Sequence, residues 1–154
     1  MDIYLIAFLI GVISGLRAMT GLMAVSWAVY FGWMHLEKSW LSFFGSSFAP
    51  YIFSALAIGE LCTDKLAITP SRKSPPGFIT RIITGAVCGA AVGIAADMIT
   101  AGLVAGAVGA VAGTLGGYEG RIRLAKAFSK DLPAALIEDA VAVGGAFLIV
   151  STIR

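Results

Sequence analysis

The apolar positions of the chain fall into long runs separated by short polar segments, and the first run covers residues 3–34. A continuous helix of that length would measure roughly 48 Å at 1.5 Å per residue, whereas the hydrocarbon core of a bilayer is about 30 Å thick. Gly15 and Gly21 weaken a helix near the middle of the run, and Thr20 can cap a new one. The pattern therefore predicts a break near Arg17, as one discontinuous helix or as two short helices.

Four more apolar runs follow, and each predicts a helix. They cover residues 50–62, 78–96, 101–118 and 133–153, with Pro50 and Pro133 where first helical turns begin. A polar loop at residues 63–77 and a basic segment at residues 119–131 separate some of them, and Asp97 falls in a tight turn. The expected fold is an all-α membrane protein, a polytopic bundle of about five or six transmembrane helices.

Glycines recur at spacings of four residues in the third and fourth predicted spans. Such small residues let helix backbones approach closely in lipid, where packing has to replace the hydrophobic effect. We expect a glycine-zipper hairpin, and the pattern leaves open whether each stripe meets the neighbouring helix or a second subunit. The glycines are Gly85, Gly89 and Gly93, Gly102 and Gly106, and Gly109, Gly113 and Gly117.

Composition agrees with a membrane location. The chain of 154 residues is 58% hydrophobic and 13% charged, about half the charged fraction of ordinary soluble domains, and its mean hydropathy is +0.91. The length predicts a single transmembrane helical domain over residues 1–154. A net charge of +2 without a basic run among aromatics disfavours nucleic acid as a partner.

The basic residues predict an orientation. Eight of the eleven flank residues 63–77 and 119–131, so these two loops are expected to face the cytoplasm. Residues 121–130 are further predicted to form a short basic amphipathic helix on an anionic leaflet. The eight are Lys65, Arg72, Lys73, Arg81, Arg121, Arg123, Lys126 and Lys130.

Charged groups inside apolar spans are costly and usually face a bundle interior or a watery cavity. Arg17, with Thr20 beside it, is a candidate substrate-binding residue, because a cation at a glycine-flanked helix break can meet an anionic solute. The alternative is that Arg17 snorkels, or pairs with a carboxylate and only holds helices together.

Four carboxylates and two more arginines complete the candidate site. The carboxylates could bind a cation, relay protons or form structural ion pairs. Arg81 and Arg121 could reach these carboxylates or lipid phosphate. The carboxylates are Glu60 and Asp64, which share one helix face, and Glu138 and Asp139 in the last span.

Familiar catalytic and metal-binding patterns are missing from the sequence. His35 is the single histidine and has no histidine or cysteine near it in sequence, so neither a metal nor a cofactor is expected. Cys62 and Cys88 lie in apolar segments and are expected to be packing residues. Without a hydrolase, Walker or dinucleotide motif, the sequence leans away from an enzyme.

Several segments together resemble an uncharacterised bacterial membrane family, domain of unknown function 4126. They are GLRAMTGL at residues 15–22, ELCTDKL at 60–66, TPSR at 69–72, Arg81 with residues 85–86, the run to residues 117–118, and ALIED at 135–139. One departure is Ala67, where the family often has proline. The resemblance implies a polytopic inner-membrane protein with no established activity. It also implies that Arg17, Glu60, Asp64 and Glu138 belong to one site.

Two functions fit these observations. The first is a small inner-membrane transporter or channel-like protein for a small polar or ionic solute, expected to be homo-oligomeric and surrounded by membrane lipids. The second is a scaffold or assembly factor that binds lipid headgroups and whose charges form structural pairs. A membrane enzyme acting on a lipid phosphate ranks last, because no nucleophile is recognisable.

Overall fold

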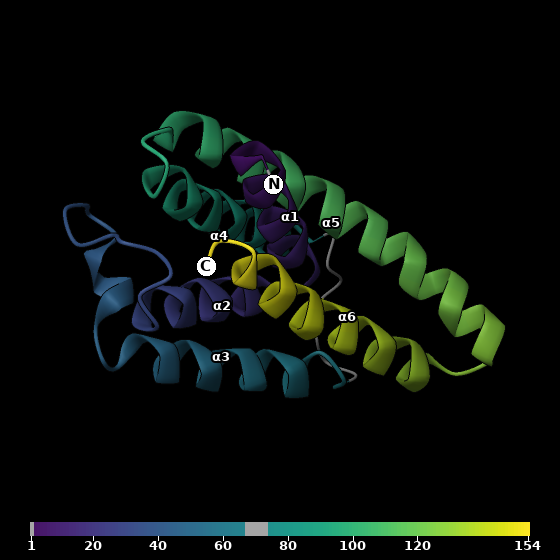
Figure 1. The fold of residues 1–154 in the computed structure, drawn as a ribbon. Coiled ribbons are helices and arrows are strands. Elements are labelled where there is room, and N and C mark those ends of the chain that lie inside the picture. The colour runs from purple at the N-terminus through teal and green to yellow at the C-terminus, as the bar shows by residue number, and fades with distance from the viewer. Residues whose placement is uncertain (1, 67–73) are drawn as a thin grey trace.

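The computed structural model describes residues 2–66 and 74–154, which fold into a bundle of helices without a strand (Figure 1). Expectations that concern Ala67, residues 69–72 and Lys73 fall outside these residues. In chain order the elements are α1 (Ile3–Leu16), α2 (Ala18–Tyr30), the short 3₁₀ helix η1 (Ser42–Gly45), α3 (Ala49–Thr63), α4 (Pro75–Ile94), α5 (Ile99–Phe128) and α6 (Asp131–Ser151).

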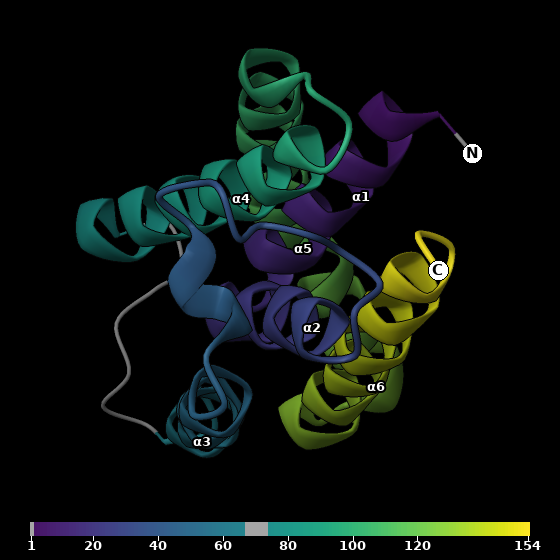
Figure 2. The same ribbon diagram turned by 60° about the vertical axis from the view of Figure 1, so that its left-hand side comes forward.

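The first apolar run consists of two helices that meet at Arg17. This residue has an extended backbone (φ −143°, ψ 108°) between the end of α1 and the start of α2. The chain turns sharply there, so that α1 and α2 run in different directions (Figures 1 and 2). The predicted break is therefore confirmed, in the form of two short helices.

The hairpin of α4 and α5 brings two backbones into contact. A Cβ atom added to Gly89 would lie only 2.7 Å from the Cα of Gly106, and one added to Gly93 would lie 3.1 Å from the Cα of Gly102. Glycine is therefore required at this crossing, because the obstacles are backbone atoms. Asp97 occupies the turn between the helices with φ 56°, which confirms its predicted role.

Helix α1 packs across the same hairpin, again through glycines. A Cβ on Gly15 would lie 2.7 Å from the backbone nitrogen of Thr114, and one on Gly113 would lie 2.9 Å from the Cα of Val12. The close approach positions the end of α1, and with it Arg17, against the middle of α5. α3 lies alongside α2 at the periphery, and α6 packs on α5, α1 and α2 (Figures 1 and 2).

One expected boundary is wrong. The fourth span was predicted to end at residue 118 and to be followed by a separate basic helix at residues 121–130. Instead α5 continues as one helix of 30 residues to Phe128, and Ser129, with left-handed backbone angles, ends it. Residues 121–128 are alanine, leucine, isoleucine, lysine, arginine and phenylalanine, and the single Gly120 before them is too weak a signal to stop a helix. The expected loop at residues 119–131 is therefore mostly helical.

Three helices, α4, α5 and α6, are long and apolar enough to cross a membrane, and α1, α2 and α3 are shorter apolar helices. Large apolar side chains cover much of the exterior. On α3 these include Tyr51, Ile52 and Ile58, all more than half exposed. A bundle that presents such side chains outward suits an apolar surrounding.

Candidate functional site

The centre of the site is Arg17, whose side chain is 0% exposed at the junction of α1 and α2. Its Nη2 donates a hydrogen bond to Oδ1 of Asp139 on α6, and its Nη1 lies 2.9 Å from Oδ2 of Asp64 at the end of α3. Buried Glu138 on α6 also interacts electrostatically with the guanidinium. Arg17 thus joins α3 and α6 to the helix break.

Two branches of alternating charge lead from this centre to the surface. In one, Asp64 accepts a hydrogen bond from Arg121 Nη1 at 2.6 Å, and Arg121 forms a two-bond fork with Asp131, at 2.9 and 2.6 Å. In the other, Asp139 accepts from Lys65 Nζ at 2.7 Å. The side chain of Asp131 is 62% exposed and that of Lys65 is 28% exposed. We call these residues, together with Arg17, the charge network.

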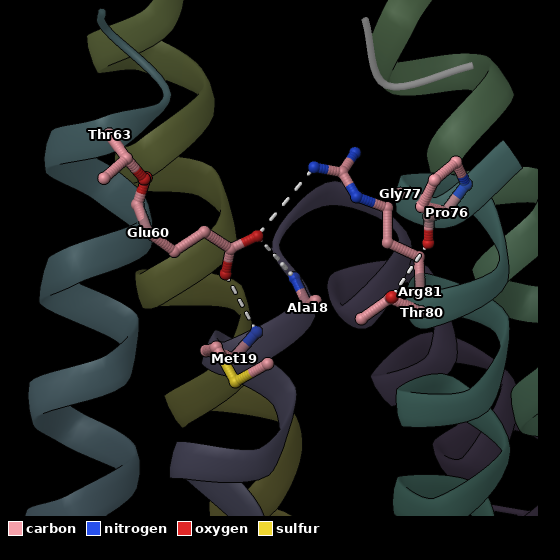
Figure 3. A pocket seen from close by; sticks show the side chains of 8 residues that line it. All are labelled: Ala18, Met19, Glu60, Thr63, Pro76, Gly77, Thr80 and Arg81. Carbon is pink, nitrogen blue, oxygen red and sulfur yellow. Dashed lines mark hydrogen bonds and ion pairs between the residues drawn. The ribbon is translucent and has the colours of Figure 1, made fainter. Parts of the chain in front are cut away.

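A second set of hydrogen bonds binds the backbone groups at the two helix ends that meet at the break. The carboxylate of Glu60 accepts hydrogen bonds from the backbone amides of Ala18 (3.0 Å) and Met19 (2.9 Å), the first residues of α2 (Figure 3). An anion is stabilised at a helix N-terminus by the unpaired amides and the helix dipole. At the other end, the Gly15 carbonyl of α1 accepts from Arg81 Nη1 at 3.3 Å. Glu60 therefore binds the start of α2, and Arg81 binds the end of α1.

Glu60 and Arg81 also line an open cleft of about 360 Å³ between α2, α3 and α4 (Figure 3). The guanidinium Nη2 of Arg81 is 3.8 Å from Oε1 of Glu60, beyond hydrogen-bond distance. The other lining residues are Ala18, Met19, Thr63, Pro76, Gly77 and Thr80. The cleft lies at the end of the bundle where α3 ends and α4 begins.

The family model described as "Domain of unknown function (DUF4126)" matches residues 4–152. The chain belongs to this family. The resemblance seen in the sequence is thereby confirmed. No curated protein and no solved structure matches the chain.

Seven of the eight predicted site residues of the DUF4126 protein fall into two neighbouring groups. Arg17, Asp64, Asp139 and Arg121 are linked in the charge network, and Glu138 lies close to it. Glu60 and Arg81 meet at the cleft. The eighth, Thr20, is buried in the first turn of α2, and its hydroxyl forms no hydrogen bond within the part of the chain that the structure describes.

Two participants were not predicted from the sequence. Thr114 of α5 donates a hydrogen bond to the Gly15 carbonyl at 3.1 Å while also bonding to the Ala110 carbonyl of its own helix. Asp131, at the start of α6, accepts two hydrogen bonds from Arg121. The polar Thr114 in a glycine-rich apolar helix was a visible signal, whereas Asp131 resembled an ordinary first-turn acid.

Within residues 2–66 and 74–154, no three His, Cys, Asp or Glu side chains are grouped so that they could hold a metal ion. Glu60, Asp64 and Asp139 instead face cations or amides.

A substitution at Glu60 tests the arrangement at the break. Glu60→Ala removes the acceptor of two helix-end amides and is expected to lower the free energy of unfolding by about 1–2 kcal/mol, the usual cost of losing a helix N-cap. Glu119→Ala, at an exposed glutamate of α5, is the matched control and should change stability by less than about 0.5 kcal/mol. Unfolding in SDS followed by tryptophan fluorescence measures both, and equal values would contradict a capping role for Glu60.

Proposed function

We propose that this protein is a multi-pass protein of the bacterial inner membrane and transports a small polar or ionic solute. The membrane location is supported by three helices of sufficient length and apolarity and by the apolar exterior. The basic residues favour residues 63–77 and 119–131 on the cytoplasmic side. The glycine contacts between α4 and α5 would act as a glycine zipper within one subunit, which leaves the outer faces for lipid and for further copies in a homo-oligomer.

The observation that carries the transport proposal is the position of Arg17 at a helix break between two carboxylates. In lipid, non-helical backbone is tolerated where protein or a polar cavity surrounds it. Transporters commonly use such broken helices to hold ions and solutes near the membrane centre. A buried ionisable group in a membrane protein is by default a functional candidate. Arg17 combines the break and the buried charge in one residue.

The charge network supplies a physical means of coupling. Asp64 and Asp139 each contact two cations, one buried and one nearer the surface. A proton or cation that neutralises either carboxylate weakens its hold on both cations at once, because each attraction depends on the carboxylate charge. The helices α3 and α6 are then less tightly joined to the break. We therefore assign Asp64 and Asp139 to coupling and Arg17 to joining α3 and α6 to the helix break.

The competing function is a lipid-binding scaffold. It is favoured by a specific observation, namely that Arg17 has both its carboxylate partners within the same chain and is completely buried. A purely structural network predicts that neutral replacements lower stability and that the folded wild type moves no solute. A transport network predicts that the folded wild type moves a solute and that neutral variants which still fold lose this movement.

Currents from proteoliposomes on a solid-supported membrane test the proposal. Jumps in proton, sodium, potassium, chloride, phosphate or acetate concentration are applied to the wild type, and we expect a saturable current with at least one of these ions. Asp64→Asn and Asp139→Asn should each reduce it at least about tenfold, equivalent to about 1.4 kcal/mol, whereas Glu119→Gln should not. Because movement of a proton together with a monoanion carries no net charge, proton flux is also followed with a pH-sensitive dye inside the vesicles. If folded wild-type protein gives neither a current with any ion nor a proton flux, transport is rejected and the scaffold function is adopted.

A further inference from the structure

The open cleft is lined by two charged side chains that do not belong to the charge network. Glu60 and Arg81 are the two titratable residues among the eight that line it. Arg81 is only 8% exposed, so its charge is largely removed from water. Figure 3 shows the two side chains extending toward each other from α3 and α4, with the start of α2 beneath them.

The carboxylate of Glu60 is held in the manner of a bound anion. Two amides at the N-terminus of α2 donate hydrogen bonds, one to each of its two oxygens. The guanidinium Nη2 of Arg81 lies 3.8 Å from one of these oxygens, Oε1. Amides of a helix N-terminus together with an arginine are a common recognition set for carboxylate and phosphate groups. The cleft thus already accommodates one oxyanion, which belongs to the protein itself.

We propose that this cleft binds a small oxyanion, a carboxylate or a phosphate, which replaces the Glu60 carboxylate on the α2 amides when Glu60 takes up a proton. The inference rests on the proposed transport function and names the substrate class of its site. One proton binds to a carboxylate oxygen of Glu60 and changes its charge from −1 to 0. A monoanion then enters, so the total charge facing Arg81 stays the same.

The groups around Glu60 hold an anion, whether that anion is the Glu60 carboxylate or the ligand. Arg81 is the charged group that faces it from α4, and α2 contributes the amides of Ala18 and Met19. The next charged groups on its own helix end, Asp64 and Lys65, are engaged with other partners in the charge network. Two anions cannot share one pair of amides, so the ionised Glu60 side chain excludes the ligand and its protonated form admits it. Proton and anion are therefore bound together.

Anion-dependent thermal stability of the purified full chain in neutral detergent tests the proposal. Sodium acetate and sodium phosphate are titrated at pH values of about 5 and about 8, so that the supply of protons differs, with sodium chloride at matched ionic strength as control. We expect saturable stabilisation at the lower pH and at least about tenfold weaker binding at the higher pH, because the two anions repel each other. Glu60→Gln should make binding independent of pH, and Arg81→Gln should abolish it.

A second experiment shows whether the oxyanion is a soluble ion or a lipid headgroup. Phosphatidic acid is added in mixed micelles, with phosphatidylcholine as control, to the wild type and to Arg81→Gln. Stabilisation by acetate or phosphate indicates a soluble ligand, whereas stabilisation by phosphatidic acid alone, lost in Arg81→Gln, indicates a lipid headgroup at the same site.

The inference is overturned if no oxyanion from either source stabilises the wild type or Glu60→Gln, or if Arg81→Gln binds as well as the wild type. Should Glu60→Gln not fold, the wild-type comparison of the two pH values together with Arg81→Gln decides. Binding is measured without a membrane gradient. Ion currents or proton flux without oxyanion binding would therefore reject this inference alone, and binding with neither current nor proton flux would reject transport alone.

Discussion

Replacing Arg17 by alanine should lower the free energy of unfolding by about 3–5 kcal/mol, because removal of one partner from a buried ion pair leaves uncompensated charge. The side chains of Asp64 and Asp139 are 10% and 12% exposed, so water cannot replace the guanidinium. Lys65 stays bound to Oδ2 of Asp139, and Arg121 stays bound to Oδ2 of Asp64, the same oxygen that Arg17 contacts. They offset part of the loss, which places the expected value near the lower end of this range. SDS unfolding monitored by the fluorescence of the three tryptophans measures the change.

The matched variant is Arg17→Lys, which keeps the charge and loses the planar fork that reaches two carboxylates at once. It should lose less stability than Arg17→Ala. Adding Asp139→Asn to Arg17→Ala should recover part of the loss, because it removes one of the stranded charges. If Arg17→Ala unfolds at the same SDS fraction as the wild type, Arg17 is not the structural centre of the network.

Gly106→Ala is expected to cost about 3 kcal/mol, at the upper end of the usual cost of overpacking. The added methyl group would meet the carbonyl oxygen of Gly85 and lie 2.8 Å from the Cα and 3.0 Å from the nitrogen of Gly89. All three obstacles are backbone atoms of α4, which cannot rotate away as a side chain can. The backbone of Gly106 is also what a Cβ on Gly11 of α1 would strike, so any shift of α5 disturbs a third helix.

Gly116→Ala provides the control on the same helix, because no atom lies within 4 Å of the position where its Cβ would be. Alanine lowers the conformational entropy of the unfolded chain and favours the helix, so this variant should be unchanged or more stable by up to about 1 kcal/mol. Thermal unfolding in detergent compares the two. Equal stability of Gly106→Ala and Gly116→Ala would show that α4 and α5 are not in backbone contact.

The parts of the fold that depend on residues close together in the sequence could be predicted from it. The break at Arg17 followed from the length of the apolar run and its glycines. The turn at Asp97 followed from the short interval between two spans. The helices α3 and α6 begin and end within two residues of the predicted limits. The end of α5 was missed because the basic residues after residue 118 were taken to form a separate helix, whereas α5 continues through them to Phe128.

The pairing of charges could not be predicted, because it depends on the packing of distant helices. Glu60 and Asp64 share a helix face, and the sequence assigned them a common role. In the structure both reach the helix break, but Glu60 caps the amides of α2 whereas Asp64 binds Arg17. Which of the adjacent acids Glu138 and Asp139 meets Arg17 is likewise set by the rotation of α6 about its axis.

The separation of Arg17 from its partners along the chain has a consequence for biogenesis. Asp139 follows Arg17 by 122 residues, so at 5–20 residues per second a ribosome adds it roughly 6–24 s later. During that interval a chain inserting into a bilayer carries an arginine whose final partner has not yet been made. Asp64, the other partner, follows Arg17 by only 47 residues, so the contact with α3 can form before α6 exists. Arg17 therefore gains its full set of partners only when the last helix of the chain has been made.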